Sequence, residues 1–182
     1  MTLTPLAHHM LTHIIVMNLL VPGVLLSVPR RWIRETWRYW PYATVAQLVL
    51  LWGWHSPPVL DAAMGSLALM AAMHISLALA AAGFWAAIID MPATGRWRSI
   101  FALLVTGKLF CLLGVLLVFA PRTLYGAMPA HGDGAAMLSP LADQQLAGLI
   151  MVVACPLTYV LAGIWIAARW FLALEEQGRM NA

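Results

Sequence analysis

Five long apolar stretches alternate along the chain with short segments that are rich in polar, charged or turn-forming residues. The apolar stretches cover residues 4–27, 37–54, 61–89, 99–119 and 142–171. A transmembrane helix needs about 20 predominantly apolar residues, whereas a helix on a soluble protein is apolar on one face only. The pattern therefore predicts an all-α integral membrane protein, in which residues 1–182 form a single bundle of about five transmembrane helices.

The segments between the stretches predict the orientation of the bundle. Arginines gather after the first and third stretches, at Arg30, Arg31, Arg34, Arg38, Arg96 and Arg98. Because cytoplasmic loops are enriched in Lys and Arg, we expect the N-terminus outside and the C-terminus in the cytoplasm. The N-terminus lacks the basic region of a cleaved signal peptide, so we expect the first span to be retained.

The composition supports the assignment to a membrane protein and argues against nucleic-acid binding. Of the 182 residues, 63% are hydrophobic and 9% are charged, whereas about 25% of residues are charged in a soluble domain. The net charge of +3 comes from the loop arginines, so we interpret it as a topology signal and not as nucleic-acid binding. We find no nucleophile–base pair and no phosphate-binding loop, so we do not expect an enzyme. Cys111 and Cys155 lie isolated in apolar stretches, as small buried side chains do.

The first apolar stretch carries ionisable residues that a lipid-facing helix would avoid. His9 and His13 are four residues apart and share a helix face, which Met17 continues, with Met10 on its flank and His8 facing away. Ionisable groups at membrane depth are costly and usually face a bundle interior or a water-filled cavity. At 1.5 Å per residue, His9 and His13 would lie about 8 and 14 Å below the outer end of the helix.

His74 lies in the third stretch, about 20 Å from its outer end at Asp61. Every histidine then lies at or outside the membrane centre, so we expect a site that opens to the extracytoplasmic side. Imidazole suits Cu, Zn and Fe, and thioether sulfur selects Cu(I). We predict a Cu(I) site with His9, His13, Met10, Met17 and His74 as ligands. Residues expected to orient a ligand or line the cavity are His8, Asp143 and Gln144. Weaker candidates are His55, His131 and Lys108, the two loop histidines being expected in solvent.

Two other interpretations of these residues stay open at this point. The histidines can form hydrogen bonds between helices without any metal, or His13 and His74 can be the two axial ligands of a b-type haem. Asp143 can cap the last helix or point into the outer cavity and bind a cation.

Three segments resemble the CtaG family of cytochrome c oxidase assembly proteins, in family order from Leu6 to about Trp170. HHMLTH at residues 8–13 resembles the family's H-M-x-x-H motif, and MHISLALAAAGFWAAII resembles its histidine-bearing helix. DQQLAGLIM at residues 143–151 is similar to the D-Q-Q-x-x-G-L-I-M signature.

The resemblance implies a multi-pass protein of the bacterial inner membrane that assists formation of a haem–copper oxidase, at the step that delivers copper on the outer side. It implies oxidase subunits or a copper chaperone as partners, besides membrane lipid, in a homo- or hetero-oligomer. A haem-b electron carrier and a structural subunit without metal are the alternatives.

Overall fold

The computed structural model describes residues 5–126 and 139–180, and its regular elements there are helices, which confirms the predicted all-α fold. The first half contains α1 (Pro5–Ile15), the π-helical turn η1 (Val16–Leu20), α2 (Val21–Ser27), α3 (Arg30–Ile33), the 3-10 turn η2 (Thr36–Tyr39) and α4 (Trp40–Trp54). The second half contains α5 (Pro57–Met64), α6 (Leu67–Ile89), the 3-10 turn η3 (Ala93–Gly95), α7 (Arg96–Phe119) and α8 (Pro140–Met180).

Four helical segments in the described part are long and apolar enough to cross a membrane. They are Leu6–Ser27, Leu67–Ile89, Ala93–Phe119 and Pro140–Met180. The first runs without a break through α1, η1 and α2. The second predicted span corresponds to α4, whose 15 residues extend about 22 Å and so fall short of a hydrocarbon core of about 30 Å. The structure therefore gives four candidate spans where about five were predicted.

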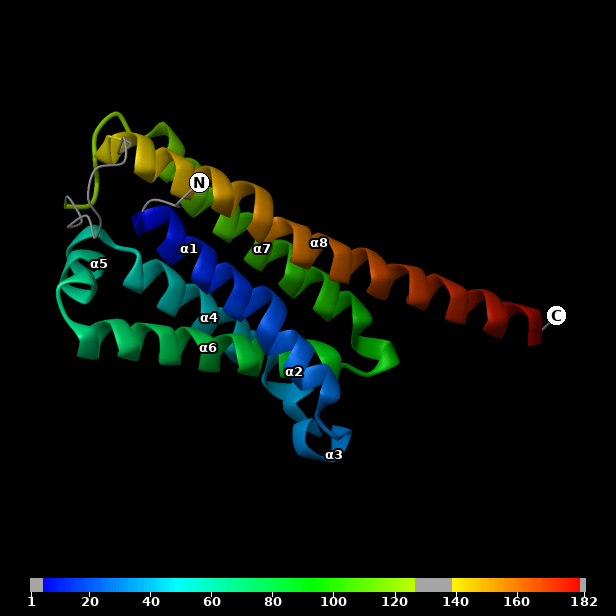
Figure 1. The fold of residues 1–182 in the computed structure, drawn as a ribbon. Helices are drawn as coiled ribbons and strands as arrows, with labels where there is room; N and C mark the ends of the chain where they lie inside the picture. The colour runs from blue at the N-terminus through cyan, green and yellow to red at the C-terminus, as the bar shows by residue number, and fades with distance from the viewer. Residues whose placement is uncertain (1–4, 127–138, 181–182) are drawn as a thin grey trace.

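Two helix boundaries differ from the predicted stretches. The third stretch, predicted as one helix over 61–89, divides at Gly65 and Ser66 into α5 and α6, and the Ser66 hydroxyl accepts the backbone N–H of Leu69 at 3.4 Å as an N-cap. The last helix is longer than predicted, with 41 residues and a length of about 60 Å. Its C-terminal part extends beyond the rest of the bundle (Figure 1).

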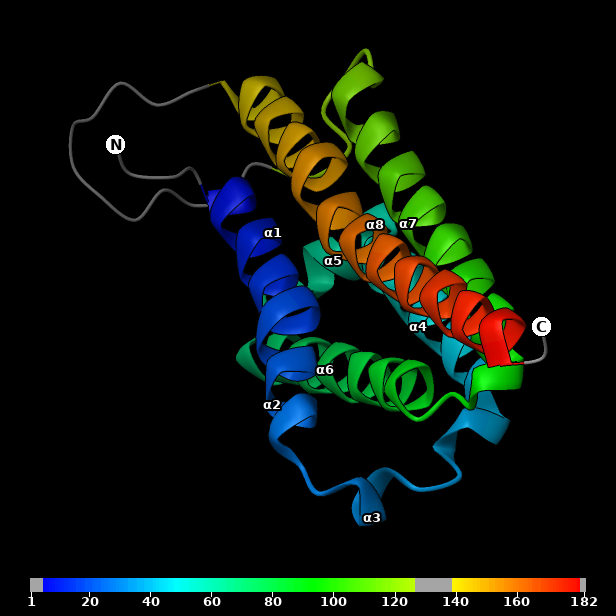
Figure 2. The same ribbon diagram turned by 90° about the vertical axis from the view of Figure 1, so that its right-hand side faces the viewer.

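The helices α7 and α8 lie side by side in both views (Figures 1 and 2). Gly114 and Gly148 allow this close approach, because a Cβ atom added at Gly148 would lie 2.7 Å from the carbonyl oxygen of Gly114. Small residues let helix backbones approach closely in membrane proteins. The helix α8 also packs against α1, and α4 packs against α6. The first span therefore lies beside the interior of the bundle.

Tyr159 of α8 is the centre of the apolar interior and is 1% exposed. The rings of Phe84, Trp85 and Phe110 surround it, with centroids 5.5 to 5.9 Å away. Gln47 of α4 donates its side-chain N–H to the Tyr159 hydroxyl at 2.8 Å. These contacts connect α4, α6, α7 and α8 and form an apolar core next to the histidine-bearing face of α1.

A π-helical turn begins at Val16, shortly after His13, and changes the register of the first span. Trp85 Nε1 donates a hydrogen bond of 3.0 Å to the carbonyl oxygen of Met17 within this turn. The wider turn buries both Met17 and the adjacent Asn18, which a regular amphipathic helix would not place inside together. Such π turns occur frequently at functional sites.

Candidate metal centre

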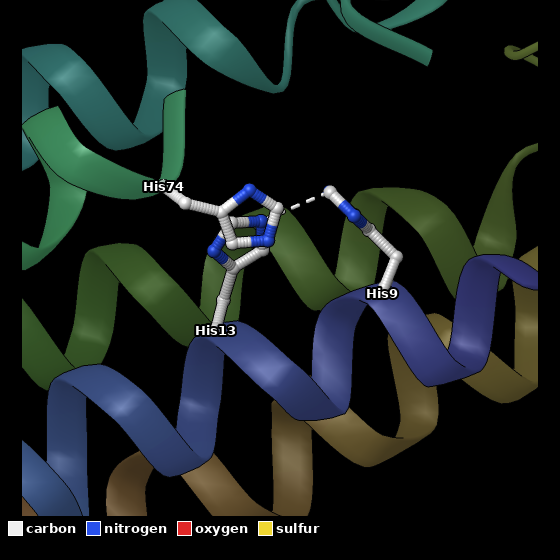
Figure 3. A group of neighbouring side chains, drawn as sticks. All are labelled: His9, His13 and His74. Carbon is white, nitrogen blue, oxygen red and sulfur yellow. Dashed lines mark hydrogen bonds between the residues drawn. The ribbon is translucent and has the colours of Figure 1, made fainter. Parts of the chain in front are cut away.

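Three histidines meet inside the bundle. His9 and His13 project from α1 toward His74 of α6, and the three rings point toward one another (Figure 3). One ring nitrogen from each residue lies within 4.8 Å of the others. His9 and His13 are buried and His74 is half-buried. The structure thus brings together the three histidines that the sequence proposed as ligands.

The Nε2 atoms of His9 and His13 share a hydrogen bond, and His74 keeps one ring nitrogen with a free lone pair. The Nε2 atoms of His9 and His13 are 2.9 Å apart. His74 holds its Nδ1 at 2.7 Å from the carbonyl oxygen of Met70. A carbonyl only accepts, so Nδ1 of His74 carries the proton and its Nε2 is left with a free lone pair. The hydrogen bond on the far nitrogen also fixes the ring orientation, as it does for metal-bound histidines.

His55, a weaker candidate from the sequence that was expected in solvent, joins the same group of rings. The ring centroid of His55 lies 5.7 Å from that of His13 and 6.5 Å from that of His9. Nδ1 of His55 donates to the carbonyl oxygen of Leu51 at 2.7 Å, so Nε2 again carries the lone pair. Within the described chain Nε2 is buried and has no hydrogen-bond partner.

The prediction of a solvated His55 is therefore wrong, because this side chain is 3% exposed. It was predicted as a loop residue because two prolines follow it. The available signal was helical spacing: Gln47, Leu51 and His55 follow one another at intervals of four residues, and all three are buried. His55 is the residue directly after the last residue of α4. Pro57 and Pro58 do end α4, but they occupy the first turn of α5, where proline is well tolerated.

Tyr125 forms a hydrogen bond with the backbone of His55. Its hydroxyl donates to the carbonyl oxygen of His55 at 2.9 Å. Burial, with a smaller contribution from the Asp61 carboxylate, raises the pKa of Tyr125 to about 12. The hydroxyl thus stays protonated and keeps this bond at any physiological pH.

Asp143 has a different role from the one predicted. We expected it to orient a histidine, but its two carboxylate oxygens accept the backbone N–H groups of Leu6 and Ala7 at 3.2 and 3.1 Å. Among the described residues no hydrogen bond joins it to a histidine. The first N–H groups of a helix have no partner in the helix, and a negative charge there is favourable. Asp143 of α8 therefore caps α1 and fixes the helix end that carries His9.

Gln144 also forms its hydrogen bonds with backbone groups. Its carbonyl oxygen accepts the N–H of Leu124 at 2.7 Å, and its amide nitrogen donates to the carbonyl oxygens of Leu117 and Arg122 at 3.2 and 3.4 Å. These bonds hold the segment that follows α7 against the start of α8. Gln144 therefore does not orient the histidines directly.

The remaining candidates are spread over different environments. Met10 and Met17 are buried and line a small internal cavity together with His13 and His55. His8 is exposed, and its carbonyl oxygen accepts the Thr12 hydroxyl. Lys108 is exposed on α7. His131 lies outside the described residues.

Comparison with family models gives one match. The model of the cytochrome c oxidase caa3 assembly factor family (Caa3_CtaG) matches residues 3–173, which is nearly the whole chain. No curated protein and no solved structure matches.

Proposed function

The chain belongs to the cytochrome c oxidase caa3 assembly factor family, and on that premise we propose that it assists oxidase assembly by holding copper at His9, His13 and His74. The observation that carries the proposal is the meeting of three imidazole groups inside an apolar helical bundle. Buried polar groups are costly unless they are satisfied, and a metal ion satisfies several lone pairs at once.

The cluster has the dimensions that a small metal ion needs. Two metal–imidazole bonds of about 2.0 Å at the tetrahedral angle place their nitrogens about 3.3 Å apart. The Nε2 atoms of His9 and His13 are 2.9 Å apart, and the candidate nitrogen of His74 is within 4.8 Å of both. Imidazole accommodates several transition metals, and the nearby thioethers of Met10 and Met17 favour Cu(I) among them. The residues therefore fit copper.

We propose different roles for the two buried histidines and for half-buried His74. His9 and His13 are buried and exclude water from one side of the cluster, while half-buried His74 is the ligand through which an ion can enter or leave. The hydrogen bond from His74 to Met70 keeps one ring nitrogen ready to bind. Bound copper would supply the ion that an oxidase subunit needs.

We place this site on the extracytoplasmic side of a bacterial inner membrane. The proposal rests on the arginine-rich segments after α2 and around η3, which are expected in the cytoplasm. It requires α4 to return the chain to the outer side before α6, although α4 alone is shorter than a hydrocarbon core. The N-terminus and the start of α8 then lie outside. The partners proposed are an oxidase subunit that receives copper and a copper chaperone that supplies it. We propose that the protein transfers an ion and catalyses no reaction of its own.

The geometry argues against the two alternative functions, a haem-b electron carrier and a structural subunit without metal. The rings of His13 and His74 are stacked, with centroids 4.5 Å apart and planes at 23°. Bis-histidine haem ligation needs a macrocycle between two rings that point end-on at its iron, and stacked rings leave no such gap. A purely structural role would favour hydrogen bonds between helices, but the observed imidazole–imidazole bond joins His9 and His13 within one helix.

The test is oxidase assembly in cells that carry His9→Ala and His13→Ala together. We expect the variant protein to reach the membrane at the normal level while copper-loaded oxidase falls several-fold. His8→Ala is the matched control, because His8 is adjacent in sequence but exposed. Normal oxidase levels in the double variant would contradict the proposal.

A further inference from the structure

A small cavity among α1, η1, α4, α7 and α8 lies directly beside the histidine cluster. Four sulfur-bearing side chains contribute to its lining: Met10, Met17, Met151 and Cys155. His13 and His55 line it as well, so the cavity and the histidine cluster share a wall. All six of these side chains are at most 4% exposed. We refer to this space as the sulfur cavity.

Helical spacing explains why the sulfur atoms gather there. Met10 and Met17 are seven residues apart on the first span, with His13 between them on the same face. Met151 and Cys155 are four residues apart and share the face of α8 that packs against α1. The first span and α8 therefore each contribute two sulfur-bearing residues to the lining of the same cavity.

An unpartnered polar atom on a lining residue distinguishes the cavity from ordinary packing. Methionine often fills irregular gaps, so buried methionines alone would carry no argument. His55 lines the cavity and is 3% exposed, yet its Nε2 makes no hydrogen bond within the described residues. Buried polar groups are nearly always satisfied, so an unpartnered imidazole nitrogen on a residue that lines this cavity indicates a ligand.

We propose that the sulfur cavity is a second metal site that takes a soft monovalent ion, Cu(I), through Cys155 and the methionine thioethers. Thiolate and thioether ligands select Cu(I) over hard ions. Binding replaces the proton of the Cys155 thiol with the ion, so one proton is released for each ion bound. The inference rests on the proposed function, which it extends: His13 and His55 face both sites, so an ion at the histidine cluster can pass to sulfur without crossing apolar space.

The test is a Cu(I) titration of the reduced full-length protein in detergent, with copper counted per chain and the ligands identified by copper X-ray absorption. We expect two copper ions per chain, one with nitrogen neighbours and one with sulfur neighbours. Cys155→Ser and Met151→Leu should each weaken the second ion at least tenfold and remove sulfur from the spectrum. Cys111→Ser and Met73→Leu are the matched controls, because neither Cys111 nor buried Met73 lines the cavity. His74→Ala should remove the nitrogen-bound ion and leave the sulfur-bound ion.

The outcomes separate this inference from the proposed function. A single copper with nitrogen neighbours only would overturn the sulfur site and support the histidine site. Loss of copper from Cys155→Ser no greater than from Cys111→Ser would also overturn the sulfur site, even if Met151→Leu failed to fold. A wild-type protein that binds no copper would overturn both.

Discussion

Replacing Asp143 with alanine tests how the histidine-bearing helix is held in place. The change removes both acceptors of the Leu6 and Ala7 N–H groups. Loss of a helix cap costs about 0.5–2 kcal/mol. If the first turn of α1 must be ordered for His9 to ligate, this free energy is subtracted from metal binding. At about 1.4 kcal/mol per factor of ten, the Kd for copper should rise about 2- to 30-fold.

Two measurements on the Asp143→Ala protein check this reasoning. Hydrogen exchange should accelerate at the amides of Leu6 and Ala7, and a Cu(I) titration should show the weaker Kd with unchanged stoichiometry. Gln145→Ala is the control, because Gln145 is adjacent and exposed. Unchanged exchange at both amides would refute the capping role. Complete loss of copper would instead indicate that Asp143 acts on a ligand directly.

Three further predictions follow from the packing, the fourth histidine and the arginine pattern. Gly148→Ala should lower the free energy of unfolding by about 1–3 kcal/mol, because its Cβ would meet the carbonyl oxygen of Gly114, whereas Gly163→Ala, with open space around it, should be neutral in thermal melts. His55→Ala should weaken copper binding more than His8→Ala in the same titration, and equal effects would place His55 outside the site. In a background without native cysteines, an external thiol reagent should label Thr123→Cys and miss Thr94→Cys, and the reverse pattern would invert the orientation.

The hydrophobic pattern anticipates the helices well but not their ends. Apolar stretches predict helices because a backbone that crosses lipid must satisfy its own hydrogen bonds along the whole span. The break at Gly65 and the continuation of α8 to Met180 depend on local capping and on packing, which hydropathy does not contain. The π turn after His13 is held by Trp85, which lies 68 residues further along the chain from its acceptor Met17. Such a contact has no signature in the local sequence.

The sequence correctly indicated those site residues whose burial inside the membrane is energetically costly. His9, His13 and His74 lie inside apolar stretches, so their burial and convergence could be expected. His55 was ranked as a weaker candidate because the prolines that follow it suggested a loop, although its helical spacing from Leu51 indicated burial. Asp143 was recognised as important, but its partners are backbone N–H groups of another helix, and no side-chain pattern reveals those.

The most direct test of the account is the metal content of the purified protein. Wild-type protein and the His8→Ala control should each retain copper at the histidine cluster after reduction and removal of loosely bound metal. The double variant with His9→Ala and His13→Ala should lose that copper while keeping its helical content in circular dichroism. Equal copper in the folded double variant and the wild type would contradict the central claim that these imidazoles hold the ion.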